Sequence, residues 1–137
     1  MPVLSKCPEP LKGLGYPCFM FTATFTFAKR AFDAEFHAMD QAIAEVARAT
    51  PGYLGEESWE DPANGLVATV YYWETLEALQ ALMQHPTHRA AKARQQQWLK
   101  GYQVVIAEVL ANYGDGGIAH PLAGRQLSTD RLRPPHA

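Results

Sequence analysis

One histidine of this chain stands where an imidazole could take part in chemistry. We expect Thr87 to cap a helix whose first turn holds His88. The dipole and the free N–H groups at a helix start disfavour an imidazolium, and a neutral imidazole can accept a proton from a phenol or bind a metal. Ala91, Gln95 and Trp98 share its helical stripe. His88 is therefore a candidate catalytic base; in the alternative, its ring bonds a backbone carbonyl and fixes the corner between two helices.

Aromatic side chains form the second group of interest. A pocket for a flat ring needs aromatic walls with a few polar groups among them. The aromatic set comprises Trp59, Tyr72, Trp73, Trp98 and Tyr102, and the first four are the candidates for substrate binding. Tyr72 and Trp73 are neighbours on one expected strand, so they point to opposite faces and at most one of them lines a given cavity. For each of these residues, ordinary core packing is the alternative interpretation.

Several other kinds of site lack their sequence signature. Pro86 separates His85 from His88, and no H-E-x-x-H or C-x-x-C motif supports zinc. There is no G-x-G-x-x-G, no P-loop and no G-x-S-x-G, so neither a dinucleotide site nor a nucleophile elbow is indicated. We therefore expect neither a metal nor a cofactor. We expect Cys7 and Cys18 to be free thiols in a reducing compartment.

Size and charge limit the class of protein. The 137 residues suit one domain, and an apolar content of 47% with 19% charged residues is typical of globular chains. A net charge of −2 provides no field that would hold nucleic acid. No stretch reaches the apolar length of a membrane helix or of a signal peptide. We expect a cytoplasmic protein that binds neither nucleic acid nor membrane.

The first half of the chain has clear periodicities. Residues 19–27 (FMFTATFTF) alternate apolar and polar side chains, which indicates a strand. Asp33 can then cap a helix that runs to about Ala49, because apolar residues recur there every three or four positions. Residues 53–61 and 66–73 form two further strands, joined by a turn that contains Asn-Gly.

The second half adds two helices and a strand. Thr75 can cap a helix whose Leu76, Leu79 and Leu82 face inward. A second helix follows Thr87 and closes near Gly101, and residues 102–110 form the last strand. These elements define a domain over residues 19–114. An irregular leader over residues 1–18 precedes it, and an arm or disordered tail over residues 115–137 follows it.

The element order β-α-β-β-α-(α)-β predicts an α+β, ferredoxin-like fold with a four-stranded antiparallel sheet. The helices can cover only one face of that sheet, yet the strands carry apolar residues on both faces. A large bare apolar face is not tolerated on a soluble monomer. We therefore expect a homodimer in which two sheets cover each other. In the alternative, the leader and the tail fold back over the second face.

Several motifs in this order resemble one known family. They are Pro-Gly-Tyr-Leu-Gly at 51–55, Tyr-Trp-Glu at 72–74, His-Pro-Thr-His at 85–88, and Trp98 before the last strand. Over residues 19–114 the chain resembles the antibiotic biosynthesis monooxygenase family, whose members are dimeric α+β barrels. The resemblance implies a pocket between sheet and helices. It also implies a monooxygenase that oxidises an aromatic or quinol-like small molecule with dioxygen, without a cofactor, and with His88 as base.

The same family leaves two alternatives open. One is a haem-binding or haem-degrading protein, with haem as cofactor and His88 as its ligand. In the haem-degrading branch, three positions carry asparagine, tryptophan and histidine; here they hold Ala23, Leu82 and Lys92. The other alternative is a module that binds a small molecule in the same pocket without turning it over.

Overall fold

The computed structural model describes residues 20–30, 33–125 and 127–128. Its elements follow one another in this order: β1 (Met20–Lys29), α2 (Ala34–Ala49), β2 (Tyr53–Asp61), β3 (Leu66–Trp73), α3 (Leu76–Gln84), α4 (Pro86–Arg94), a 3-10 turn (Gln95–Gln97), β4 (Leu99–Val109), β5 (Ala111–Asn112) and β6 (Leu127–Ser128). Within these ranges, no helix has both the length and the apolar character that a membrane crossing requires.

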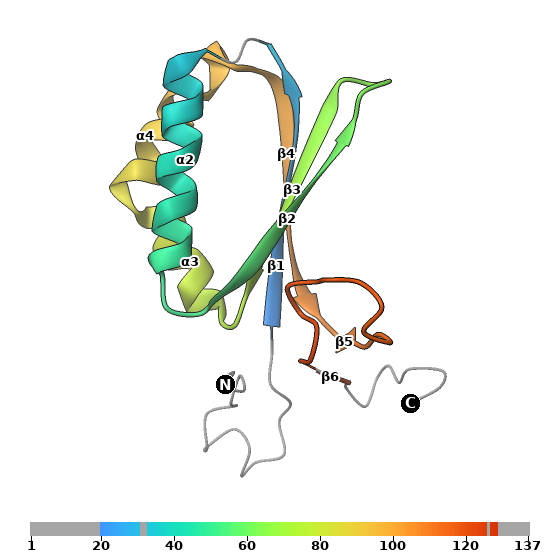
Figure 1. Cartoon of the computed structure of the whole chain (residues 1–137). Coiled ribbons are helices and arrows are strands. Elements are labelled where there is room, and N and C mark those ends of the chain that lie inside the picture. Colours follow the sequence, from blue (N-terminus) through green and yellow to red (C-terminus); the bar gives the residue numbers. More distant parts are fainter. Residues whose placement is uncertain (1–19, 31–32, 126, 129–137) are drawn as a thin grey trace.

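Four antiparallel strands form the main sheet, in the order β2-β3-β1-β4. The three α-helices of the described residues all lie on one side of it (Figure 1). This arrangement confirms the α+β, ferredoxin-like prediction. β2 and β3 have the predicted bounds, whereas β4 begins at Leu99 rather than at 102. The earlier start follows from pairing, because Lys29 lies opposite Leu99 and the Arg30 amide donates to the Trp98 carbonyl at 2.7 Å.

Side-chain caps fix where the helices begin. The Asp33 carboxylate accepts from the Phe36 amide at 2.9 Å, and the Thr75 hydroxyl accepts from the Ala78 amide at 3.1 Å, so both predicted caps are confirmed. The predicted Thr87 cap is wrong. α4 begins one residue after His85, whose Nδ1 accepts from the Thr87 amide at 3.1 Å. Pro86 then takes the first helical position, which proline favours because no N–H is needed there.

Strand periodicity divides the sheet into two faces. On β1, the aromatic rings of Phe21, Phe25 and Phe27 point to the helices, while the alternate threonines point away. On β3, Trp73 lies opposite Phe21 and so faces the helices, whereas Tyr72 lies opposite Thr22 and faces away. We call these the helix face and the outer face.

Two buried clusters hold the helices to the helix face. One surrounds Trp73, which is fully buried, and includes Leu79 and Leu82 of α3. The other surrounds Trp98 and Phe27 near the opposite end of β1. The third predicted inward leucine of α3, Leu76, is instead 37% exposed because it lies in the first turn of the helix, next to the cap. Between the two clusters, side chains leave open space, which is described below.

The segment after β4 lies on the outer face, across the sheet from the helices (Figure 1). Leu122 of this segment is buried, and the Asn112 amide group donates to the Leu122 and Arg125 carbonyls at 2.8 and 2.7 Å. Pro121 approaches β2 so closely that a Cβ on Gly55 would lie 2.7 Å from the proline Cβ. The predicted leader over residues 1–18, with Cys7 and Cys18, lies outside the described residues.

Candidate functional site

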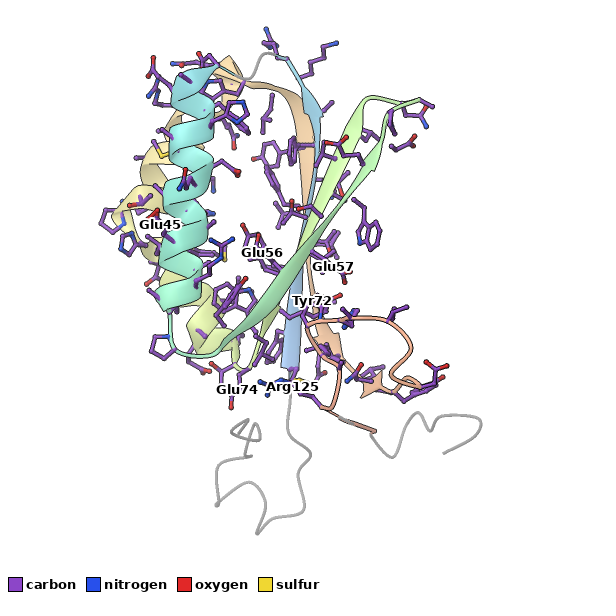
Figure 2. The ribbon with its side chains drawn as sticks, viewed as in Figure 1. Glu45, Glu56, Glu57, Tyr72, Glu74 and Arg125 are labelled. Atoms are coloured by element: carbon purple, nitrogen blue, oxygen red, sulfur yellow. The ribbon has the colours of Figure 1, made fainter. Side chains whose placement is uncertain are left out.

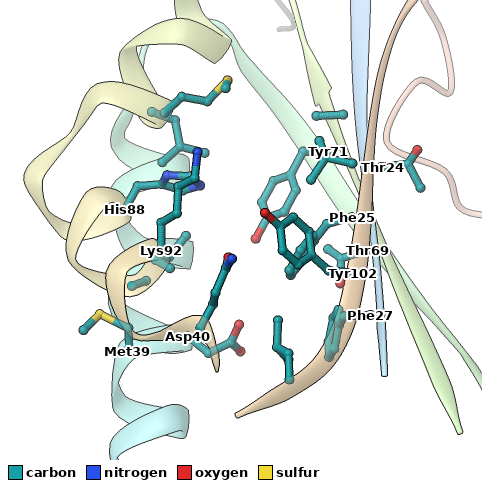
Figure 3. Close-up of a pocket in the computed structure, with 18 of the residues that line it drawn as sticks. Thr24, Phe25, Phe27, Met39, Asp40, Thr69, Tyr71, His88, Lys92 and Tyr102 are labelled. Carbon is teal, nitrogen blue, oxygen red and sulfur yellow. The ribbon is translucent and has the colours of Figure 1, made fainter. Parts of the chain in front are cut away.

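A cavity of about 380 Å³ lies between the helix face of the sheet and the helices (Figure 3). Its floor is formed by β1, β3 and β4, and its roof by α2, α3, α4 and the 3-10 turn. Most of its wall is apolar. Ligand sites are typically concave, largely apolar and between about 300 and 1,000 Å³ in volume, so this cavity can hold a small organic molecule.

His88 lines this cavity from α4, together with Ala91, Gln95 and Trp98 of the stripe predicted above. Desolvation by burial lowers the pKa of His88, Lys92 lowers it further, and a hydrogen bond with the Met83 backbone raises it in part. The ring is therefore neutral at pH 7. The bond with Met83 joins α4 to α3, as the alternative interpretation of His88 expects. The Nδ1 atom of the ring is buried and has no hydrogen-bond partner among the described residues. A neutral imidazole with an unpartnered nitrogen can accept a proton or hydrogen bond from a ligand.

The two buried tryptophans of the cavity wall also have an unused polar atom. Trp73 and Trp98 are 0% and 3% exposed, and within the described ranges neither indole N–H has a hydrogen-bond acceptor. Buried polar groups almost always have partners, so each exception calls for an explanation. Both residues line the cavity. A ligand that carries oxygen acceptors is one explanation for these two N–H groups and for the free nitrogen of His88.

Among the polar residues of the cavity, Tyr71, Lys92 and Asp40 were not predicted as site residues, whereas Tyr102 belonged to the predicted aromatic set. Tyr71 and Tyr102 project from the sheet with their hydroxyls toward the cavity, Lys92 lies beside His88, and Asp40 enters from α2 (Figure 3). Lys92 occupies one of the three positions compared with the haem-degrading branch. A signal for Asp40 was present, since it lies four residues after Phe36 and shares its helix face. Its charge suggested a solvent-facing role instead.

An acidic network lies beside this cavity on β2 and α2. The Tyr53 hydroxyl donates to the Glu56 carboxylate at 2.8 Å, and Arg48 lies 3.8 Å from the same carboxylate. Burial raises the pKa of Tyr53 to about 12, and the bond to Glu56 adds to this effect. Burial, followed by the charges of Glu56 and Asp40, also raises the pKa of Tyr71. Both phenols therefore keep their protons; Tyr53 donates to Glu56, and Tyr71 can donate to a ligand in the cavity.

Burial and then the charge of Glu56 raise the pKa of Asp40, while His37 lowers it. The Asp40 side chain is largely exposed at the edge of the cavity. This carboxyl is therefore a group that can exchange protons with water and still reach the cavity.

Two predicted ring-binding residues, Tyr72 and Trp59, lie away from this cavity. Strand parity puts Tyr72 on the outer face, and Trp59 of β2, paired with Ala68, is 65% exposed there. The Tyr72 hydroxyl donates to Glu57 at 2.5 Å (Figure 2). It also lies 3.3 Å from the Nε2 atom of His120. These contacts hold the segment after β4 against the sheet.

The described residues contain no group of three or more histidine, cysteine, aspartate or glutamate side chains that could hold a metal ion. At the positions compared with the haem-degrading branch, Ala23, Leu82 and Lys92 all line the cavity. They offer no asparagine, tryptophan or histidine there, so the chain does not fit that branch's haem site.

Comparison with known proteins gives the same fold. The chain is 31% identical over 110 residues to the uncharacterized protein YqjZ of Bacillus subtilis, which covers 80% of this chain and 89% of the relative. SnoaB, a cofactor-independent oxygenase from Streptomyces nogalater, superposes with a TM-score of 0.54 at 12% identity, over 69% of this chain and 95% of SnoaB.

The protein PA3566 of Pseudomonas aeruginosa superposes with a TM-score of 0.57 at 18% identity, over 71% of this chain and all of PA3566. At such low identities, these two structures support the fold alone. The model of the family described as antibiotic biosynthesis monooxygenase matches residues 19–94, which is more than half of the chain. With its ferredoxin-like sheet and the cavity beneath its helices, the chain belongs to the antibiotic biosynthesis monooxygenase family.

Proposed function

We propose that this protein is a cofactor-independent monooxygenase that oxidises a phenolic or quinol-like small molecule with dioxygen in the cavity described above. The observation that carries the proposal is the His88 imidazole, which is neutral, faces an apolar cavity and has a buried nitrogen without a partner among the described residues. Membership of a family named for such enzymes supports it.

The reaction follows from these groups. His88 takes the phenolic proton, and an apolar surrounding makes the resulting anion a stronger reductant because water no longer solvates it. The anion passes electrons to dioxygen, and a C–O bond forms at an adjacent ring carbon to give a hydroperoxide. Loss of the C–H proton from that carbon and cleavage of the O–O bond then yield a carbonyl and water. The substrate supplies all four electrons, so one oxygen atom enters the product and the other leaves as water.

Different residues of the cavity wall have different roles in this oxidation. Trp73 and Trp98 contact the ring, and their indole N–H groups can donate to its oxygen atoms. The apolar wall keeps water from the peroxide intermediate. Asp40 can return a proton from solvent to the cavity.

We further propose that the active form is a homodimer with the outer faces of two sheets in contact. Large apolar side chains are exposed on the outer face and on the segment that lies over it: Trp59, Val105 and Ile118 are 65%, 53% and 75% exposed. Sedimentation analysis tests this proposal. We expect a dimer, and we expect Val105→Asp to shift it toward monomer; a monomeric wild-type chain at micromolar concentration would contradict the proposal.

Oxygen uptake with simple quinols tests the catalytic proposal. We expect the wild-type protein to consume one dioxygen per quinol, to release no hydrogen peroxide, and to place one labelled oxygen atom in the product. His88→Ala should lower the rate by at least about a hundredfold, the usual contribution of a general base. His120→Ala, the same change outside the cavity, should keep the rate. Equal rates for the wild type and His88→Ala would reject His88 as the base.

The two alternative functions, a small-molecule-binding module and a haem protein, would give different results with the same purified protein. A small-molecule-binding module would bind quinols without oxygen uptake. A haem protein would shift the Soret band of added haemin, and that shift would be lost in His88→Ala.

A further inference from the structure

Lys92 is a cation without an ion-pair partner among the described residues, at the wall of a mostly apolar cavity. It lies four residues after His88 on α4, so the two side chains leave the same side of the helix about one turn apart, about 6 Å along its axis (Figure 3). Both line the cavity. Throughout the described part of the chain, Lys92 forms no salt bridge. Its charge is close enough to His88 to disfavour the imidazolium.

The Lys92 side chain is exposed to water at the edge of the cavity. Its ammonium group disfavours a proton on His88, and a ligand that enters the cavity from solvent can reach it. The Asp40 carboxyl, also in the cavity wall, enters from α2 and makes no ion pair with Lys92. An anionic group on the ligand would satisfy Lys92 directly and would gain a charge-assisted hydrogen bond.

We propose that the cavity selects an acidic ring, namely a phenol or quinol that carries a carboxylate. Lys92 binds the carboxylate, and the phenolic hydroxyl meets the free nitrogen of His88. This inference rests on the proposed function in one respect, since it takes the ring to be the substrate that His88 deprotonates. Lys92 acts as a specificity residue, and its charge also favours the phenolate that forms beside it.

Two probes that differ only in charge test the proposal. Gentisate is a quinol with a ring carboxylate, and gentisamide is the same quinol with a neutral amide. Their binding is measured by equilibrium dialysis under nitrogen, so that no oxidation occurs. We expect gentisate to bind about tenfold more tightly, because a hydrogen bond to a charged group contributes more than one to a neutral group. Added salt should reduce this preference.

Three variants separate a specific contact from a general charge effect. Lys92→Met keeps the apolar stem and should lose the tenfold preference, with gentisamide binding unchanged within about twofold. Lys92→Glu should reverse the preference. Arg89→Met removes one positive charge from the same helix outside the cavity, and it should keep the preference.

Three outcomes would overturn the inference: equal affinities of the wild type for the two probes, the same loss in Lys92→Met and Arg89→Met, or no binding of gentisate at millimolar concentration. Because binding is measured without oxygen, failure of the catalytic proposal shows separately. A protein that prefers gentisate yet consumes no dioxygen keeps the charge selectivity and loses the monooxygenase activity.

Discussion

Removal of one hydroxyl group on the outer face tests how the segment after β4 is held. Tyr72→Phe deletes the donor that reaches Glu57 at 2.5 Å (Figure 2). The same hydroxyl lies 3.3 Å from His120. The Nδ1 atom of His120 accepts from the Leu122 amide at 3.0 Å, so its proton is on Nε2, 3.1 Å from the same Glu57 carboxylate. One carboxylate thus receives two donors, one from the sheet and one from the segment.

The size of the expected loss in stability follows from these contacts. A hydrogen bond to a charged group contributes about 1.5–3 kcal/mol, and the variant leaves Glu57 with one donor instead of two. The Glu57 and His120 side chains are 21% and 30% exposed, so water replaces part of the loss. We expect Tyr72→Phe to lower the free energy of unfolding by about 1–2 kcal/mol. Burial, and then the bond to Glu57, raise the pKa of Tyr72, so the donor is present throughout the neutral range.

Urea unfolding at a fixed protein concentration measures this change, with Tyr113→Phe as the matched control. Tyr113 lies on the same segment, is 53% exposed and makes no hydrogen bond to any described residue, so its variant should stay within about 0.5 kcal/mol of the wild type. Hydrogen exchange at residues 111–125 should accelerate in Tyr72→Phe alone. Equal stabilities of the two variants would refute the idea that this hydroxyl holds the segment.

Three further changes have effects whose direction the structure gives. His88 has a pKa below its ordinary 6.5, so the unfolded chain binds its proton first as the pH falls. The free energy of unfolding should therefore drop below about pH 6.5. His88→Gln should reduce this pH dependence in urea titrations. Asp40 has a raised pKa, so its ionisation opposes folding as the pH rises; Asp40→Asn should be slightly more stable than the wild type at pH 7 by thermal unfolding. Gly55→Ala adds a Cβ at φ +141° and 2.7 Å from the Pro121 Cβ, so it should destabilise the chain by about 1–3 kcal/mol in urea and loosen residues 111–125.

Local sequence signals predicted most of the fold. The alternation in β1 and the Asn-Gly turn after β2 depend on neighbouring residues alone, and the structure has both. Thr87 and His85 show the limit of such signals. Both side chains can accept a hydrogen bond from a backbone amide at a helix start, so the choice between them depends on where the chain turns out of α3. Proline at the next position favours His85.

The cavity was harder to predict because its wall combines elements far apart in sequence. The His88 stripe could be predicted since its residues repeat on one helix. Tyr71 could not, because strand parity alone does not say which face the helices cover. The contact of His120 with Tyr72 joins residues 48 positions apart and leaves no local pattern. An aspartate such as Asp40 is usually solvent-exposed, so its charge outweighed the signal given by its spacing of four residues from Phe36.

The polar atoms of the cavity, taken together, favour a ligand over a purely structural role. A tryptophan that only fills a core can have its N–H satisfied by a neighbouring carbonyl, yet neither Trp73 nor Trp98 has such an acceptor among the described residues. A histidine that only fixes a helix corner needs no adjacent cation, yet Lys92 lies one turn away and disfavours its charged form. The two buried indole N–H groups cost stability without any gain for the fold. An acidic, oxygen-bearing ring would satisfy the indole donors, the imidazole acceptor and the ammonium group in one binding event.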